Sequence, residues 1–177
     1  IVEGVSFKTG RQLWSYLGVE KNTIPSATVT RDLILVGSSV KPSSIALPRD
    51  KAGSIAKDQV SWTAENATSS MSSPLVVGEN VYYISRAGVL SCNDLKTGKQ
   101  LWDHRLPASC WATPVGAGDA IYYFCKEGST VVMKNERSGP LELAKSKLDI
   151  EGPVYGVAVV NGAIVMRTGS QVFALLN

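Results

Sequence analysis

A short motif near the N-terminus of the chain occurs a second time in its middle. Residues 8–14 read Lys-Thr-Gly-Arg-Gln-Leu-Trp, and residues 96–102 read Lys-Thr-Gly-Lys-Gln-Leu-Trp, an offset of 88 residues. A diverged copy ends at Trp62, 48 residues after the first tryptophan and 40 before the second. A fourth copy covers residues 138–143 and has Leu143 where a tryptophan is expected. Repeats of about 40–50 residues are typical of propeller blades.

Short apolar runs recur at the same interval and predict β-strands. Each follows a turn that contains glycine, asparagine or aspartate. The runs cover residues 33–36, 81–84, 121–124 and 164–166. Another short strand is expected before and after each run, and a Thr-Gly turn then leads to a fourth strand that ends in Leu-Trp. Each repeat is therefore predicted to form a four-stranded antiparallel sheet.

A single sheet of this kind cannot bury both of its faces, so the copies must stack face to face. We predict an all-β β-propeller of about four four-stranded antiparallel blades, which is part of a larger ring or is completed by oligomerisation. The expected blades cover roughly residues 24–65, 71–107, 113–146 and 153–177, and residues 1–17 supply strands of a neighbouring or closing blade.

The tryptophans at the ends of the outer strands have a structural interpretation. Trp14, Trp62 and Trp102 are each predicted to pack on the neighbouring blade, where a ring of this size buries about 150–250 Å². Leu143 is expected to fill the same position less completely. Residues 41–57, which are rich in Pro, Ser and Lys, are expected to protrude as a loop of the first full blade.

The composition excludes several classes of protein. The chain of 177 residues is 44% hydrophobic and 19% charged, which excludes a disordered chain. Its 18 basic and 15 acidic residues are scattered and give a net charge of +3, so we expect no nucleic-acid partner. No apolar run is long enough for a transmembrane segment. The chain begins at Ile1 rather than at methionine, which we interpret as a processed form or an excised piece.

The thiol and imidazole groups offer little for metal or nucleophilic chemistry. The chain has three cysteines, Cys92, Cys110 and Cys125, and one histidine, His104. A zinc site would need all four side chains, so we expect small buried thiols, no metal site and no catalytic residue. A Cys92–Cys125 disulfide in an oxidising compartment stays open as an alternative.

Residues 92–102 resemble the motif of PQQ-like β-propeller repeats, Ala-x-Asp-x-x-Thr-Gly-x-x-x-Trp. They read Cys-Asn-Asp-Leu-Lys-Thr-Gly-Lys-Gln-Leu-Trp, and only Cys92 departs from the motif. The resemblance implies a quinoprotein-like propeller fold. The family includes quinone-dependent dehydrogenases, the propeller of the outer-membrane assembly lipoprotein and exported PQQ-binding-like repeat proteins. The resemblance therefore implies a periplasmic, extracellular or cell-envelope location.

The resemblance also defines what a quinone enzyme would need. In the family's enzymes the quinone PQQ lies on the propeller axis with a Ca²⁺ ion, between a tryptophan and a disulfide of two adjacent cysteines. This chain has no adjacent cysteine pair, and Trp111 is better explained as a plug at the channel mouth. We expect no cofactor and a non-catalytic binding or scaffold propeller. The alternative is a fragment of a PQQ-dependent dehydrogenase-type quinoprotein, with PQQ and Ca²⁺.

The loops before each inner strand and those between the second and third strands share one face of a propeller. We predict an interaction face there for a protein or peptide partner, since arginine and aromatic side chains are enriched in protein interfaces. Its candidate residues are Arg86, Trp111, Lys126, Glu127, Tyr155 and Arg167. The other partners expected are a second copy of the chain, by self-association, or missing blades of a parent protein.

Overall fold

The computed structural model describes residues 1–19, 24–40, 44–64, 66–160 and 162–176, which form short strands joined by turns. The strands make five sheets, and three of these are four-stranded. Apart from a short 3₁₀ turn at Lys57–Gln59, the described residues contain no helix, and therefore no helix long and apolar enough to span a membrane. The predicted all-β fold of four-stranded antiparallel sheets is confirmed.

The sheets follow one another along the chain, and we number them in that order. Sheet 1 contains β1 (Val2–Val5), β2 (Gln12–Tyr16) and β6 (Gly53–Ser54). Sheet 2 contains β3 (Thr28–Val29), β4 (Leu33–Val36), β5 (Ile45–Pro48) and β7 (Trp62–Thr63). Sheet 3 contains β8 (Leu75–Val77), β9 (Asn80–Ile84), β10 (Val89–Asp94) and β11 (Gln100–Arg105). Sheet 4 contains β12 (Val115–Ala117), β13 (Ala120–Phe124), β14 (Ser129–Lys134) and β15 (Glu142–Lys147). Sheet 5 contains β16 (Gly156–Val160), β17 (Ala163–Arg167) and β18 (Val172–Leu175).

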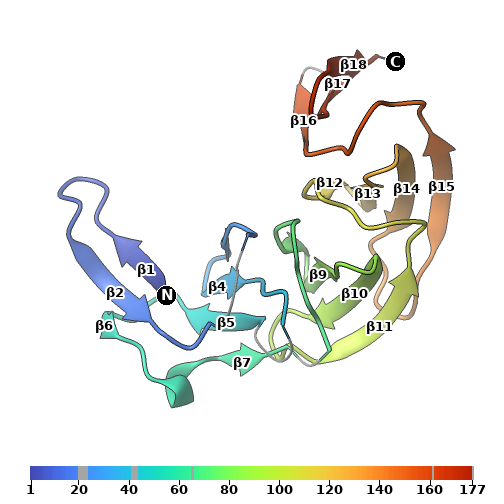
Figure 1. Ribbon diagram of the computed structural model, residues 1–177. Helices are drawn as coiled ribbons and strands as arrows, with labels where there is room; N and C mark the ends of the chain where they lie inside the picture. The colour runs from blue at the N-terminus through green and yellow to red at the C-terminus, as the bar shows by residue number, and fades with distance from the viewer. Residues whose placement is uncertain (20–23, 41–43, 65, 161, 177) are drawn as a thin grey trace.

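The five sheets stand side by side along an open arc (Figure 1). Each neighbouring pair of sheets encloses one apolar cluster. The cluster between sheets 3 and 4 includes the fully buried Tyr82, Leu90, Ile121 and Met133. Smaller clusters lie between sheets 1 and 2, 2 and 3, and 4 and 5. The core is therefore divided among the contacts between sheets, as expected for stacked propeller blades.

The repeated Thr-Gly motif forms the turn between the third and fourth strands of a sheet. In sheet 3 the carboxylate of Asp94 accepts hydrogen bonds from the backbone N–H groups of Lys96 and Thr97, at 3.1 and 2.9 Å. Gly98 closes the turn with a φ of 70°, a left-handed conformation that glycine adopts without steric cost. The Asp-x-x-Thr-Gly part of the motif is thus explained by local hydrogen bonding and backbone geometry.

Trp62 and Trp102 each join their sheet to the next one. The indole N–H of Trp62 in sheet 2 donates to the carbonyl of Leu95 in sheet 3, at 3.0 Å. The indole N–H of Trp102 in sheet 3 donates to the carbonyl of Glu136 in sheet 4, at 2.9 Å. Leu95 and Glu136 occupy the same position of their Thr-Gly and Ser-Gly turns. The same contact between sheets therefore occurs twice.

The two remaining positions in this series differ. Trp14 is only half-buried and packs over Gly4 of its own sheet, where a Cβ atom would lie 2.1 Å from the indole nitrogen. The loop of sheet 2 that would receive Trp14 has lost the Thr-Gly motif. Leu143, in sheet 4, is 53% exposed.

The prediction that residues 41–57 protrude as a loop is wrong for two parts of this stretch. Ile45–Pro48 is strand β5, and its Ile45, Ala46 and Leu47 are buried in the core. Gly53–Ser54 forms β6, which pairs in parallel with β2 of sheet 1. Residues 41–43 lie outside the described part. The chain between β5 and β7 therefore connects sheets 1 and 2 rather than projecting from them.

Sheets 1 and 5, at the two ends of the arc, each have three described strands. The outer strand β2 pairs with β1 and β6, and β18 pairs with β17. Residues 12–16 and 171–176 are therefore not paired with each other in this structure, and the chain does not form a closed four-bladed ring.

Candidate interaction face

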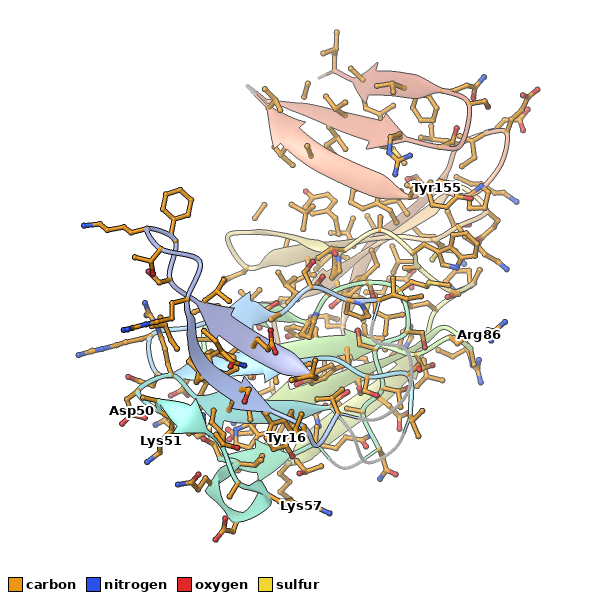
Figure 2. The ribbon with its side chains drawn as sticks, turned by 60° about the vertical axis from the view of Figure 1, so that its left-hand side comes forward. Tyr16, Asp50, Lys51, Lys57, Arg86 and Tyr155 are labelled. Atoms are coloured by element: carbon orange, nitrogen blue, oxygen red, sulfur yellow. The ribbon has the colours of Figure 1, made fainter. Side chains whose placement is uncertain are left out.

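Five of the six residues predicted to form an interaction face lie on loops, Arg167 is the last residue of β17 (Ala163–Arg167), and backbone hydrogen bonds join these segments. The backbone N–H of Leu106 donates to the carbonyl of Gly88, and that of Tyr155 donates to the carbonyl of Arg167. Each bond joins a linker between sheets to the turn between the second and third strands of a sheet. The linkers and turns therefore meet on one side of the arc. In Figure 2, Arg86 and Tyr155 lie on this side, away from Asp50 and Lys51.

Three of the six residues touch one another. The rings of Trp111 and Tyr155 have their centroids 5.3 Å apart and are tilted by 56°. The guanidinium carbon of Arg167 lies 5.3 Å from the centroid of the Tyr155 ring, within the range of a cation–π contact. Tyr155 is 41% exposed, Arg167 is exposed and Trp111 is half-buried. Two aromatic rings and a cation thus form a partly open cluster at the boundary of sheets 4 and 5.

Arg86, Lys126 and Glu127 lie on neighbouring turns of the same side. The β9–β10 turn that carries Arg86 packs on the linker after sheet 3, because a Cβ at Gly88 would lie 2.9 Å from the Ala108 carbonyl group. The same linker accepts a hydrogen bond from Lys126 N–H through the Ser109 carbonyl. Arg86 and Lys126 are exposed, whereas Glu127 is half-buried. These three residues extend the face beyond the aromatic cluster.

The cations of this face have no ion-pair partner among the described residues. The four ion pairs of that part of the chain involve other side chains, and two of these pairs are highly exposed. We call Arg86, Trp111, Lys126, Glu127, Tyr155 and Arg167 the interaction face. It offers unpaired positive charge beside aromatic surface, which can bind carboxylate and apolar groups of a protein.

The residues present do not fit a quinone and calcium site. Within the described ranges, no three His, Cys, Asp or Glu side chains gather where they could hold a metal ion. The Trp111 ring packs on Tyr155 at a tilt rather than presenting a free flat surface. The three cysteines are separated in sequence, so the adjacent-cysteine disulfide of the enzymes cannot form. His104 is half-buried on β11, an outer strand.

A polar network between sheets 3 and 4 was not predicted. Arg137 donates to the carboxylate of Asp94 at 2.6 Å and to the side-chain oxygen of Asn80 at 2.8 Å. Asn135 accepts hydrogen bonds from Asn80 and from the hydroxyl of Tyr82, both at 2.8 Å. The hydrogen bond from Arg137 lowers the pKa of Asp94. The repeats gave no sign of this network, because Asn135 and Arg137 lie just before the fourth copy at residues 138–143.

The cysteines do not have the arrangement of the Cys92–Cys125 disulfide that the sequence left open as an alternative. All three are buried and free, so Cys92 and Cys125 are not joined by a disulfide. Instead the sulfur atoms of Cys110 and Cys125 lie 3.3 Å apart. Sequence spacing gave no sign of this pair, because the linker that carries Cys110 contains no strand.

Comparison with known proteins identifies relatives of the fold. The family described as outer membrane protein assembly factor BamB matches residues 1–140. The crystal structure of BamB from Moraxella catarrhalis is similar with a TM-score of 0.68 and 18% sequence identity, over 94% of this chain and 50% of that one. The chain thus spans about half the length of that protein. No curated protein matches the chain.

Two designed proteins have similar structures. The computationally designed Ika4 protein has a TM-score of 0.70 at 12% identity, over 95% of this chain and 99% of that one. The computationally designed Ika8 protein has a TM-score of 0.61 at 10% identity, over 96% of this chain and 63% of that one. At these identities the structural matches establish the fold alone.

Proposed function

Since the chain belongs to the family of the outer membrane protein assembly factor BamB, we propose that it is a non-catalytic propeller module that binds another protein. The partner would dock on the interaction face. We further propose that the module works in an exported compartment of the cell envelope, by analogy with the family. The analogy supports a scaffold role, and the arrangement of side chains supports the location of the contact.

The contact between Trp111, Tyr155 and Arg167 carries this proposal. A tilted aromatic pair beside an arginine is the kind of cluster that dominates binding energy at protein interfaces. The Tyr155 and Arg167 backbones are joined by a 2.8 Å hydrogen bond, so both side chains project from one fixed point. Because the two side chains are already held in place, binding of a partner would cost little of their conformational entropy.

The charges of the face favour a partner with negatively charged groups. Arg86, Lys126 and Arg167 are exposed and are not engaged in ion pairs within the described part of the chain. A segment with carboxylates beside an apolar or aromatic side chain would match both features. We therefore propose an acidic peptide segment as the element that this face recognises.

A displayed peptide library selected against the chain tests this proposal. We expect selected peptides to be rich in Asp, Glu and aromatic residues, and we expect Arg167→Ala and Tyr155→Ala each to weaken their binding at least fivefold. Arg31→Ala is the matched control, because Arg31 is also exposed but lies in the β3–β4 turn. If the control weakens binding as much as Arg167→Ala, or if neither face variant has an effect, the proposed face is wrong.

The ends of the arc suggest a second kind of partner. Apolar side chains of sheet 5 and of the N-terminal hairpin are exposed, among them Val159, Val172 and Phe7. Sheet edges with exposed apolar residues pair readily with further strands. We propose that further strands, from parent sequence or from a second copy of the chain, complete sheets 1 and 5.

A further inference from the structure

The two cysteines that touch lie directly beneath the interaction face. Cys110 precedes Trp111 in the linker between sheets 3 and 4, and Cys125 precedes Lys126 in the β13–β14 turn. Their sulfur atoms are 3.3 Å apart, with the Cys110 thiol donating to the Cys125 sulfur. Both side chains are almost fully buried. The pair is therefore an ordered contact within the core and not a chance encounter of mobile surface thiols.

One backbone hydrogen bond holds the two segments of the pair side by side, although neither cysteine lies in a strand. The N–H of Lys126 donates to the carbonyl of Ser109 at 2.9 Å, which places the next residues inward, Cys110 and Cys125, opposite each other. The N–H of Cys125 is directed to the other side, where it donates to the carbonyl of Ser129. The two sulfur atoms, 3.3 Å apart, need to approach by only about 1.3 Å to reach the length of a disulfide bond.

The environment of the two sulfur atoms makes them unequal. The hydrogen bond from Cys110 lowers the pKa of Cys125 against the opposing effect of burial, and a backbone hydrogen bond from Ala108 adds to the lowering. The same hydrogen bond to Cys125, together with burial, raises the pKa of Cys110. Cys125 is thus the sulfur that loses its proton first and attacks a disulfide, because the thiolate is the nucleophile.

We propose that Cys110 and Cys125 form a reversible disulfide that ties the linker carrying Trp111 to the β13–β14 turn. The oxidant is a disulfide, such as oxidised glutathione or an exported thiol–disulfide oxidoreductase. Because both thiols are buried, the linker of residues 107–113 must first open locally. The Cys125 thiolate then attacks one sulfur of the oxidant, a mixed disulfide forms and one thiolate leaves. Cys110, after losing its proton, then attacks the Cys125 sulfur and releases the second thiolate. Two protein thiols are oxidised and one disulfide is reduced to two thiols.

The consequence of this crosslink is local order in the interaction face. Reduced, the linker of residues 107–113 is held near Lys126 by the Ser109 carbonyl and by side-chain packing. Oxidised, a covalent bond is added one residue before Trp111. This inference does not rest on the proposed protein-binding role, because the chemistry and the ordering can be measured without a partner.

Peptide mapping of the full chain tests the disulfide. Cleavage after Lys and Arg gives residues 106–126 as one peptide with both cysteines, and places Cys92 in the separate peptide 87–96. The chain is treated with oxidised glutathione, denatured and alkylated. We expect peptide 106–126 to be unalkylated and lighter by two hydrogens than the same peptide with both thiols reduced, and we expect Cys92 to be alkylated. Two alkylated cysteines in peptide 106–126, or a link to Cys92, would overturn the proposal.

Single variants test the order of the two steps. In Cys110→Ser the second attack is impossible, so we expect glutathione to remain on Cys125 as a stable mixed disulfide. In Cys125→Ser we expect at least tenfold slower glutathione attachment. Cys92→Ser is the matched control for removing a buried thiol, and it should leave the 106–126 disulfide intact. Equal rates of attachment in the first two variants would refute Cys125 as the attacking sulfur.

Amide hydrogen exchange tests the ordering. We expect exchange in residues 107–113 to slow at least tenfold on oxidation, while the corresponding linker at residues 148–154, which has no cysteine, stays unchanged. Exchange that is the same in both redox states would show that the bond does not fix the linker.

Discussion

Replacing Trp102 by alanine removes a side chain that serves two sheets at once. Trp102 is 8% exposed, and its ring lies 6.0 Å from that of Tyr82, measured between centroids. Large-to-small changes at buried aromatic positions cost about 3–5 kcal/mol, and the lost hydrogen bond to the Glu136 carbonyl is included in that range. We expect Trp102→Ala to lower the free energy of unfolding by this amount, measured by urea denaturation with fluorescence or circular dichroism.

Two further variants separate the causes. Trp102→Phe keeps most of the buried ring and removes the indole N–H, so it should cost about 1–2 kcal/mol. Trp14→Ala removes the same side chain from a half-buried position that is not joined to the next sheet by a described indole hydrogen bond. We expect its cost to be about half that of Trp102→Ala. If Trp14→Ala and Trp102→Ala are equally costly, the docking of tryptophan on the next sheet does not explain the role of Trp102.

Three other predictions follow from contacts between sheets. Gly98→Ala should lower the thermal unfolding temperature more than Gly10→Ala. Both glycines have a positive φ, but only at Gly98 would a Cβ atom lie 2.5 Å from the Trp62 ring. Equal losses would show that the ring is not held there. Because Arg137 lowers the pKa of Asp94, the pair should contribute stability above the unfolded pKa of about 4 and lose it as the pH falls through the folded value. Arg137→Met should therefore destabilise at pH 7 and flatten the acid limb of stability against pH; an unchanged limb would contradict this. Light scattering should find the isolated chain associated, and a stable monomer at high concentration would argue against completion of its end sheets by a second copy.

The sequence was most informative where the repeat is strong. The two near-identical motifs, with Gly10 and Gly98 at matching places, predicted turns and outer strands because hydrogen bonding within the turn determines them locally. The tryptophans recur at intervals of 48 and 40 residues, and these intervals predicted a stack of sheets. In the structure the indole N–H groups of Trp62 and Trp102 each donate a hydrogen bond to the next sheet.

The sequence was least informative where a contact depends on segments without a pattern. Ile45–Pro48 was assigned to a loop because Pro, Ser and Lys surround it, although its apolar side chains fill the contact between sheets 1 and 2. The contact of Cys110 with Cys125 depends on how an irregular linker passes the C-terminal end of β13, and the spacing of residues in the sequence does not predict such a path. The cluster of Trp111, Tyr155 and Arg167 lies between these extremes: the residues were predicted to share a face, but their mutual contact was not.

The division of the core among successive pairs of sheets bears on how the chain comes apart. In the described part of the chain each apolar cluster joins two neighbouring sheets, so the free energy of folding is close to a sum of terms for single sheets and for adjacent pairs. The pair formed by sheets 3 and 4 has the extended aromatic cluster, an indole bond and the Arg137 network. The pair formed by sheets 4 and 5 has a smaller cluster and an exposed Leu143. Opening therefore costs least at the C-terminal sheet and most at the centre, and such a chain frays from its end as a series of partly folded species.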